Sequence, residues 1–104
     1  MAFRLGDIIE KTDAGPLRGI QREIACDCWF TSRGRSFPRI IKVMDEQGII
    51  HTISDIEILF SEEKMYSGIA TVEHLCRINF GASKETVKLI YNKETCKWHI
   101  NLLP

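Results

Sequence analysis

ATVEHLCRINF, residues 70–80, is the stretch that decides the fold, because its apolar residues recur at every second position. A period of two is typical of a β-strand that buries one face. The apolar face would carry Ala70, Val72, His74, Cys76, Ile78 and Phe80, and the opposite face Thr71, Glu73, Arg77 and Asn79. The stretch therefore predicts a long strand with His74 and Cys76 on its apolar face.

Two shorter alternating segments follow this strand. Val87, Leu89 and Tyr91 share one face of the first segment. The apolar face of the second consists of Cys96, Trp98, Ile100 and Leu102. Short polar turns separate the three segments, which is typical of an antiparallel meander. The sequence thus predicts a C-terminal three-stranded meander with Trp98 in the core.

The same alternation occurs in the first half of the chain. Ile24, Cys26, Cys28 and Phe30 alternate with more polar neighbours over residues 23–30. Two further runs, residues 39–44 and 49–53, are separated by a polar loop that ends in Gly48. Glycine readily adopts the left-handed conformation that closes a short hairpin loop. We therefore expect a strand over residues 23–30 and a β-hairpin over residues 39–53.

Two segments are ambiguous between strand and helix. Within residues 54–68, Ile56, Ile58 and Phe60 alternate like a strand, whereas Ser54 followed by Glu57 imitates a helix capping box. We favour a strand over residues 56–60, followed by a polar loop or a single helical turn over residues 61–64. Residues 3–11 fit either a short strand or a short helix.

These segments together indicate an all-β fold, with at most one short helix. The chain has 104 residues and no linker or internal repeat, so it is expected to form a single domain over residues 1–104. Six or seven short strands must have their edges closed or covered. A small antiparallel barrel or a curled sheet of six to seven strands meets that need.

Composition narrows the class of protein. Equal numbers of basic and acidic residues, 14 of each, argue against a general polyanion binder. No apolar run approaches the roughly 20 residues that span a bilayer, and no secretion signal follows Met1, so we expect a cytoplasmic protein without membrane contact. The cytosol keeps thiols reduced, which predicts that the four cysteines are free and packed at partly buried positions.

Cysteine and histidine spacing raises a metal- or thiol-dependent function as an alternative. Cys26 and Cys28 would point to one face of a strand, as would His74 and Cys76. Four such groups are what tetrahedral zinc requires. However, each cysteine lies in phase with large apolar residues, and the tight Cys-x-x-Cys turn of structural zinc sites is missing. We favour core packing, with no metal and no cofactor.

Catalytic motifs give no support for an enzyme. Cys28, His74 and Asp27 supply the residue types of a nucleophilic triad, but nothing in their spacing brings them together. The sequence contains no Gly-x-Ser-x-Gly, no phosphate-binding glycine loop and no His-Glu-x-x-His. The prediction is a protein without catalytic activity.

Charge segregation is the most informative functional feature. Residues 45–63 contain six acidic residues and no basic one, whereas six of the seven arginines precede them. Residues 29–39, here named the arginine segment, contain three arginines among three aromatic residues and no acid. Arginine binds phosphate or carboxylate in bidentate fashion, and a neighbouring aromatic ring can stack on a base. The predicted ligand-binding residues are Trp29, Arg33, Arg35 and Arg39.

The sequence thus favours a small binding module. Its arginine segment would contact nucleic acid or an acidic protein surface, with Phe30 and Phe37 anchored inward. The acidic residues 45–63 would weaken this site if they folded beside it. A structural homo-oligomer that pairs an exposed strand is the remaining alternative, besides the metal- or thiol-dependent one.

Overall fold

The computed structural model describes residues 20–80 and 82–102, which form seven β-strands. The predicted strand or helix over residues 3–11 lies outside the described residues. The strands are β1 (Ile20–Phe30), β2 (Ser36–Met44), β3 (Ile50–Ile53), β4 (Ile56–Tyr66), β5 (Ile69–Phe80), β6 (Ser83–Asn92) and β7 (Lys97–Leu102). No helix is present among the described residues.

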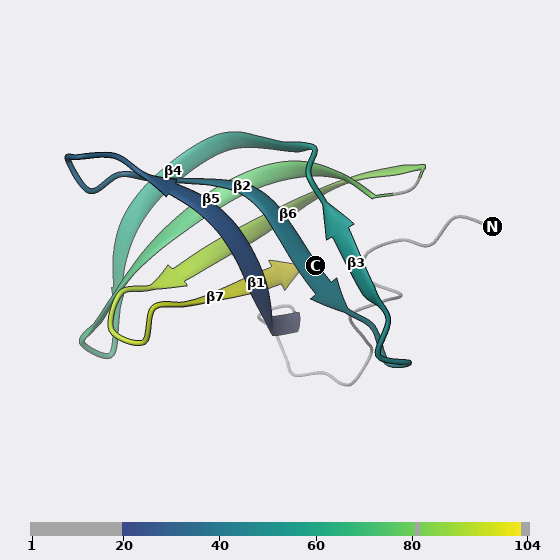
Figure 1. The fold of residues 1–104 in the computed structure, drawn as a ribbon. Coiled ribbons are helices and arrows are strands. Elements are labelled where there is room, and N and C mark those ends of the chain that lie inside the picture. The colour runs from purple at the N-terminus through teal and green to yellow at the C-terminus, as the bar shows by residue number, and fades with distance from the viewer. Residues whose placement is uncertain (1–19, 81, 103–104) are drawn as a thin grey trace.

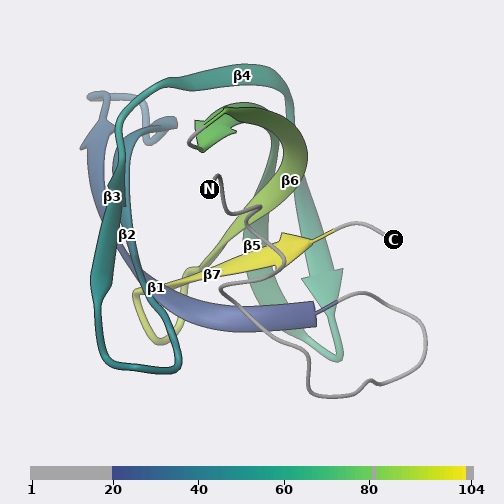
Figure 2. The ribbon, with the colours of Figure 1, turned by 90° about the vertical axis from the view of Figure 1, so that its right-hand side faces the viewer.

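The seven strands form one antiparallel sheet that curls into a half-barrel (Figures 1 and 2). The strand order is β3-β2-β1-β7-β6-β5-β4, so the first and last described strands pair in the middle of the sheet. β5, β6 and β7 are the predicted C-terminal meander. The all-β fold with a curled antiparallel sheet is therefore confirmed.

The core fills the inside of the curl. Its buried side chains are Ile41, Val43, Ile53, Cys76, Ile78, Val87, Leu89, Trp98, Ile100 and Leu102. They come from five strands, and those of β5, β6 and β7 keep the inward phase that the alternating sequence predicts. Curling brings these rows together, so that one sheet buries its own apolar face without a second layer.

The hairpin between β2 and β3 forms as expected. Gly48 has a φ of +85° and its amide donates to the carbonyl of Asp45. The Asp45 carboxylate accepts hydrogen bonds from the amides of Gln47 and Ile49, which ties the loop to itself. Only glycine adopts that backbone conformation without steric cost, which explains its place in the loop.

β4 differs from the sequence prediction in length and in phase. The loop or helical turn expected over residues 61–64 is wrong, because the strand continues to Tyr66. In its pairing with β5, Ile58 opposes Cys76 and Phe60 opposes Leu75, so Leu59 is an extra residue in a β-bulge. Phe60 consequently leaves the apolar face and is 56% exposed.

Cys96 also departs from its predicted place. It lies in the turn before β7 with a φ of +59° and is exposed, rather than on the apolar face of that strand. The amide of Cys96 donates to the carbonyl of Asn92, which closes this turn. The apolar face of β7 therefore begins at Trp98.

Candidate functional site

The arginine segment folds as the tip of the β1–β2 hairpin. The amide of Gly34 donates to the carbonyl of Thr31, and Gly34 has a φ of +86°. The amide of Thr31 donates to the carbonyl of Arg35, and the Arg35 amide donates to the Thr31 hydroxyl. These bonds fix the backbone of the loop and leave the side chains of Arg33 and Arg35 exposed.

Trp29 and Arg39 meet on the outer face of this hairpin. Cys28 opposes Pro38 and Asp27 opposes Ile40, so Arg39 is an extra residue in a second β-bulge. Its guanidinium carbon lies 4.8 Å from the centroid of the Trp29 ring, while Trp29 remains 63% exposed. This geometry is a cation–π contact.

Arg35 makes a similar contact next to that pair. Its guanidinium carbon lies 5.3 Å from the centroid of the Phe37 ring, and Phe37 is the cross-strand partner of Trp29. Trp29, Arg35 and Arg39 are thus brought together by one hairpin. Arg33 is placed differently, because it lies at the loop tip and lines a pocket together with Arg35.

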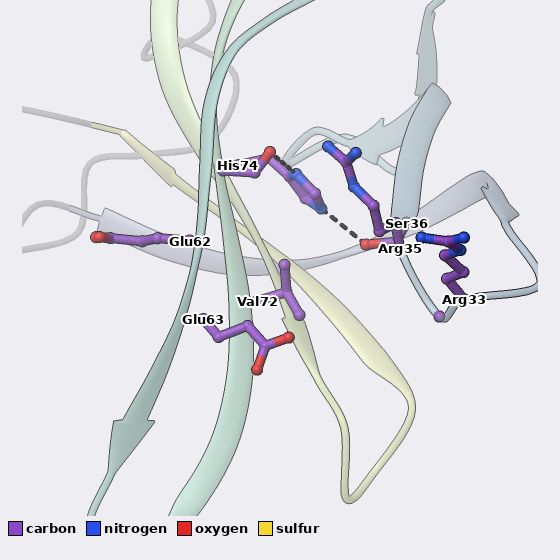
Figure 3. Close-up of a pocket in the computed structure, with 9 residues that line it drawn as sticks. Arg33, Arg35, Ser36, Glu62, Glu63, Val72 and His74 are labelled. Carbon is purple, nitrogen blue, oxygen red and sulfur yellow. Dashed lines mark hydrogen bonds between the residues drawn. The ribbon is translucent and has the colours of Figure 1, made fainter.

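The pocket lies between the hairpin and the strands β4 and β5, with a volume of about 270 Å³. In Figure 3, Arg33 and Arg35 approach from one side, Glu62 and Glu63 lie on the other, and His74 stands between them. The remaining lining residues are Gly34, Ser36, Ser61 and Val72. Part of the acidic region 45–63 therefore does fold beside the arginine segment.

The two acidic side chains of the pocket are already paired with lysines. Glu62 lies 3.2 Å from Nζ of Lys64, and Glu63 lies 3.6 Å from Nζ of Lys93. In Figure 3 the Glu62 carboxylate points away from His74. By contrast, Arg33, Arg35 and Arg39 form no ion pair with a carboxylate within residues 20–80 and 82–102. The positive charge of these three arginines is therefore available to an anionic ligand.

His74 is buried at the base of the pocket with both ring nitrogens hydrogen-bonded. Nε2 lies 2.9 Å from Oγ of Ser36, and Nδ1 lies 2.6 Å from Oγ of Ser61. Burial lowers the pKa of His74 below its ordinary value of 6.5, because the charged form loses its hydration. The imidazole is therefore neutral at neutral pH.

A row of aromatic rings leads from this histidine to the surface. His74 stacks on Trp98 with centroids 5.9 Å apart, and Trp98 contacts Tyr91 at 5.0 Å. Tyr91 in turn contacts Phe30 at 5.5 Å. The predicted inward anchoring of Phe30 is wrong in part, since the ring joins this row yet remains 53% exposed.

The thiol and histidine set of the alternative function is not assembled into a metal site. No group of three or more metal-ligating side chains comes together in the described part of the chain. Burial is the main cause that raises the pKa of Cys26 and of Cys76 to about 12. All four cysteines are free, with Cys26 and Cys28 half-buried and Cys76 buried. The thiols of Cys26 and Cys76 therefore stay protonated at neutral pH, which makes them poor ligands and poor nucleophiles.

Sequence reasoning missed two of the polar residues at the pocket, Ser36 and Ser61. Ser36 is 38 positions and Ser61 is 13 positions from His74, so no local motif connects them. The sequence also predicts a loop or a single helical turn at Ser61, although this residue is within a strand. The alternation around residue 74 was the one available signal, because it placed an ionisable side chain on a buried face.

Comparison of the chain with protein-family models, with curated proteins and with solved structures finds no match. The described residues also contain no helix long and apolar enough to cross a membrane.

Proposed function

We propose that this protein is a small binding module that holds single-stranded nucleic acid on the arginine segment. The observation that carries the proposal is the grouping of Trp29, Arg35 and Arg39 on the outer face of one hairpin, with Arg33 at its tip. Exposed arginines that have no carboxylate partner among the described residues suit phosphate, and an exposed tryptophan suits a base. The module would work in a reducing compartment such as the cytoplasm, in keeping with its four free thiols.

The stacked arrangement favours single strands over duplexes. Trp29 is 63% exposed, which leaves ring surface for an unpaired base. The guanidinium groups of Arg35 and Arg39 lie over aromatic rings in cation–π contacts, which help to hold them in place before a ligand arrives. A prearranged group loses less side-chain entropy on binding. Bases in a duplex are stacked on one another and would not reach the ring.

The zero net charge of the chain does not oppose this proposal at short range. Salt screens charges beyond roughly 8–10 Å at physiological ionic strength. Glu62 and Glu63, the acids of the adjoining pocket, are paired with Lys64 and Lys93. Each of these two carboxylates therefore has a lysine partner already, which leaves the arginines available to a ligand. Affinity should be modest, because few phosphates can be contacted by one hairpin.

The test is a titration of labelled oligo(dT) at several salt concentrations. We expect log K to fall with log salt with a slope near −2, since each contacted phosphate contributes roughly −0.7 for single strands. Trp29→Ala should weaken binding by removing the stacking surface, which is worth roughly 1–3 kcal/mol per base. The double variant of Arg33→Ala and Arg35→Ala should flatten the salt slope.

Lys84→Ala is the matched control, because Lys84 is an exposed cation near the beginning of β6 and is outside the β1–β2 hairpin. Equal losses in Lys84→Ala and in the arginine variant would show that binding is general electrostatics rather than a site. An absence of binding at tens of micromolar would reject nucleic acid and leave an acidic protein surface as the ligand of the same arginines.

The edge strand β4 favours self-association as a second candidate. β4 is 11 residues long and lies at one end of the described sheet, hydrogen-bonded to β5 alone among the described strands. Such an edge can pair with another copy of itself. A molar mass of one chain by light scattering at high protein concentration would reject this candidate.

A further inference from the structure

Ser61, His74 and Ser36 form a hydrogen-bonded relay at the base of the pocket, which binding to the outer face of the hairpin does not use. We propose that this relay is a serine hydrolase site for a small ester or thioester that carries an anionic group. Ser61 is the nucleophile and His74 the general base, while Ser36 positions the imidazole. This activity goes beyond the proposed binding function and does not depend on it.

Both ring nitrogens of His74 are within hydrogen-bond distance of a serine hydroxyl. Nδ1 lies 2.6 Å from Ser61 Oγ, and Nε2 lies 2.9 Å from Ser36 Oγ. A neutral imidazole offers one donor and one acceptor. In the tautomer that the proposed reaction requires, Ser61 donates its proton to Nδ1, and Nε2–H donates to the buried Ser36. A nucleophile, a base and a third group that orients the base are the recurring parts of such sites.

The β-bulge at Leu59 is what brings the nucleophile to the base. Beyond the bulge, Ser61 opposes His74 across the β4–β5 pair. Without the extra residue the register would shift by one, and Phe60 would face His74 instead. Bulges commonly re-aim side chains beside functional sites. Ser61 remains exposed, so a substrate can reach its hydroxyl.

The pocket supplies the surroundings that such a reaction needs. Arg33 and Arg35 line it without carboxylate partners in the described ranges, so they can hold an anionic group of the substrate. Val72 gives an apolar wall, and Glu63 limits the charge on the opposite side. Around His74 the charged groups lining the pocket are these two arginines with Glu62 and Glu63, and the Trp98 ring stacks on the imidazole.

The reaction balances with water as the co-reactant. Ser61 Oγ attacks the carbonyl carbon while its proton moves to Nδ1 of His74. The bond to the leaving alkoxide or thiolate then breaks, and that group takes the proton from Nδ1. Water attacks the acyl-Ser61 ester and passes a proton to Nδ1, which returns to Ser61 as the carboxylic acid leaves.

The test is labelling of the folded full-length chain with a fluorophosphonate probe, in which Ser61 Oγ replaces fluoride on phosphorus. Peptide mass mapping should find the adduct on Ser61, and Ser61→Ala should abolish it. Ser54→Ala is the matched control, because Ser54 is an exposed serine between β3 and β4 and does not line the pocket. Labelling should also rise with pH to a plateau, with its midpoint below 6.5.

Variants of the other two residues separate catalysis from a structural role. His74→Gln should slow labelling of Ser61 by roughly 100-fold or more, the usual contribution of a general base. Ser36→Ala should slow it and shift the pH midpoint, whereas Ser36→Thr, which keeps a hydroxyl, should restore both. Labelling that is absent, or equally fast in a folded His74→Gln protein, would overturn the proposal.

The outcome is independent of the nucleic-acid proposal. Trp29→Ala should leave labelling unchanged, and Ser61→Ala should leave oligonucleotide binding unchanged. Each proposal can therefore fail while the other stands.

Discussion

Ser36 and His74, which are 38 positions apart in sequence, are joined by a hydrogen bond of 2.9 Å between β2 and β5. β2 and β5 are separated by three strands in the order of the sheet, so this bond crosses the interior of the half-barrel rather than running along the ladder. Ser61 of β4 bonds the other ring nitrogen. One neutral imidazole thus links the strands β2, β4 and β5 at the base of the pocket.

Stability should fall as the pH drops below about 6.5, because the pKa of His74 is lowered by burial. Above that pH the ring is neutral in both the folded and the unfolded chain, and the network contributes fully. Below it the imidazole is protonated in the unfolded chain but not in the folded chain. The free energy of unfolding therefore falls by up to about 1.4 kcal/mol for each unit by which the pH is lowered. Urea unfolding at pH 7.5, 6.0 and 5.0 measures this slope.

His74→Gln is the control for this pH dependence. Glutamine can still donate and accept but has no titrating ring, so the slope should be smaller than in the original protein. An equal slope in both proteins would assign the pH dependence to another group.

Trp98→Ala should destabilise the fold by roughly 3–5 kcal/mol, the usual cost of removing a buried large aromatic side chain. Trp98 is 7% exposed, pairs with Ile24 across the central β1–β7 ladder, and contacts the rings of His74 and Tyr91. Chemical denaturation gives the free energy of unfolding. A domain of this size has a total of about 5–15 kcal/mol, so an unchanged midpoint would contradict the core placement.

Phe60→Ala should cost only about 0.5 kcal/mol, in spite of the apolar alternation around it. The bulge at Leu59 turns Phe60 outward, where its side chain is 56% exposed. Ile78→Ala, a fully buried residue on the paired strand, should cost roughly 2–5 kcal/mol and is the comparison. Similar losses for the two variants would mean that β4 pairs without a bulge.

The four thiols should react with a maleimide at widely different rates. Cys96 is exposed in a turn, whereas burial is the largest cause that raises the pKa of Cys26 and Cys76 to about 12. The reactive species is the thiolate, so Cys96 should be modified first and Cys76 last. Mass spectrometry over time gives the order, and Cys96→Ser should remove the fast phase. Rapid modification of Cys76 in the folded state would contradict its burial.

The strands and the faces of most of them could be predicted from the sequence. Side chains on a strand alternate strictly, so an in-phase row such as Ile78, Cys76 and His74 identifies the buried face wherever the register is unbroken. The hairpin loop at Gly48 could also be predicted from the local sequence, because a left-handed backbone position favours glycine. The arginine segment was found by composition alone, and the structure leaves its three arginines exposed while it buries Ser36 and Pro38.

Tertiary structure alone decided the bulges, the strand order and the pocket. An extra residue such as Leu59 or Arg39 is defined only against the partner strand, and it shifts every following side chain to the other face. The alternation of Ile56, Ile58 and Phe60 therefore gave a wrong prediction for the face of Phe60, since nothing within the strand sequence marks the shift. Ser61 meets His74 through the bulged pairing of β4 with β5. Ser36 reaches the same ring because the sheet curls, and curvature depends on how all seven strands pair rather than on any one of them.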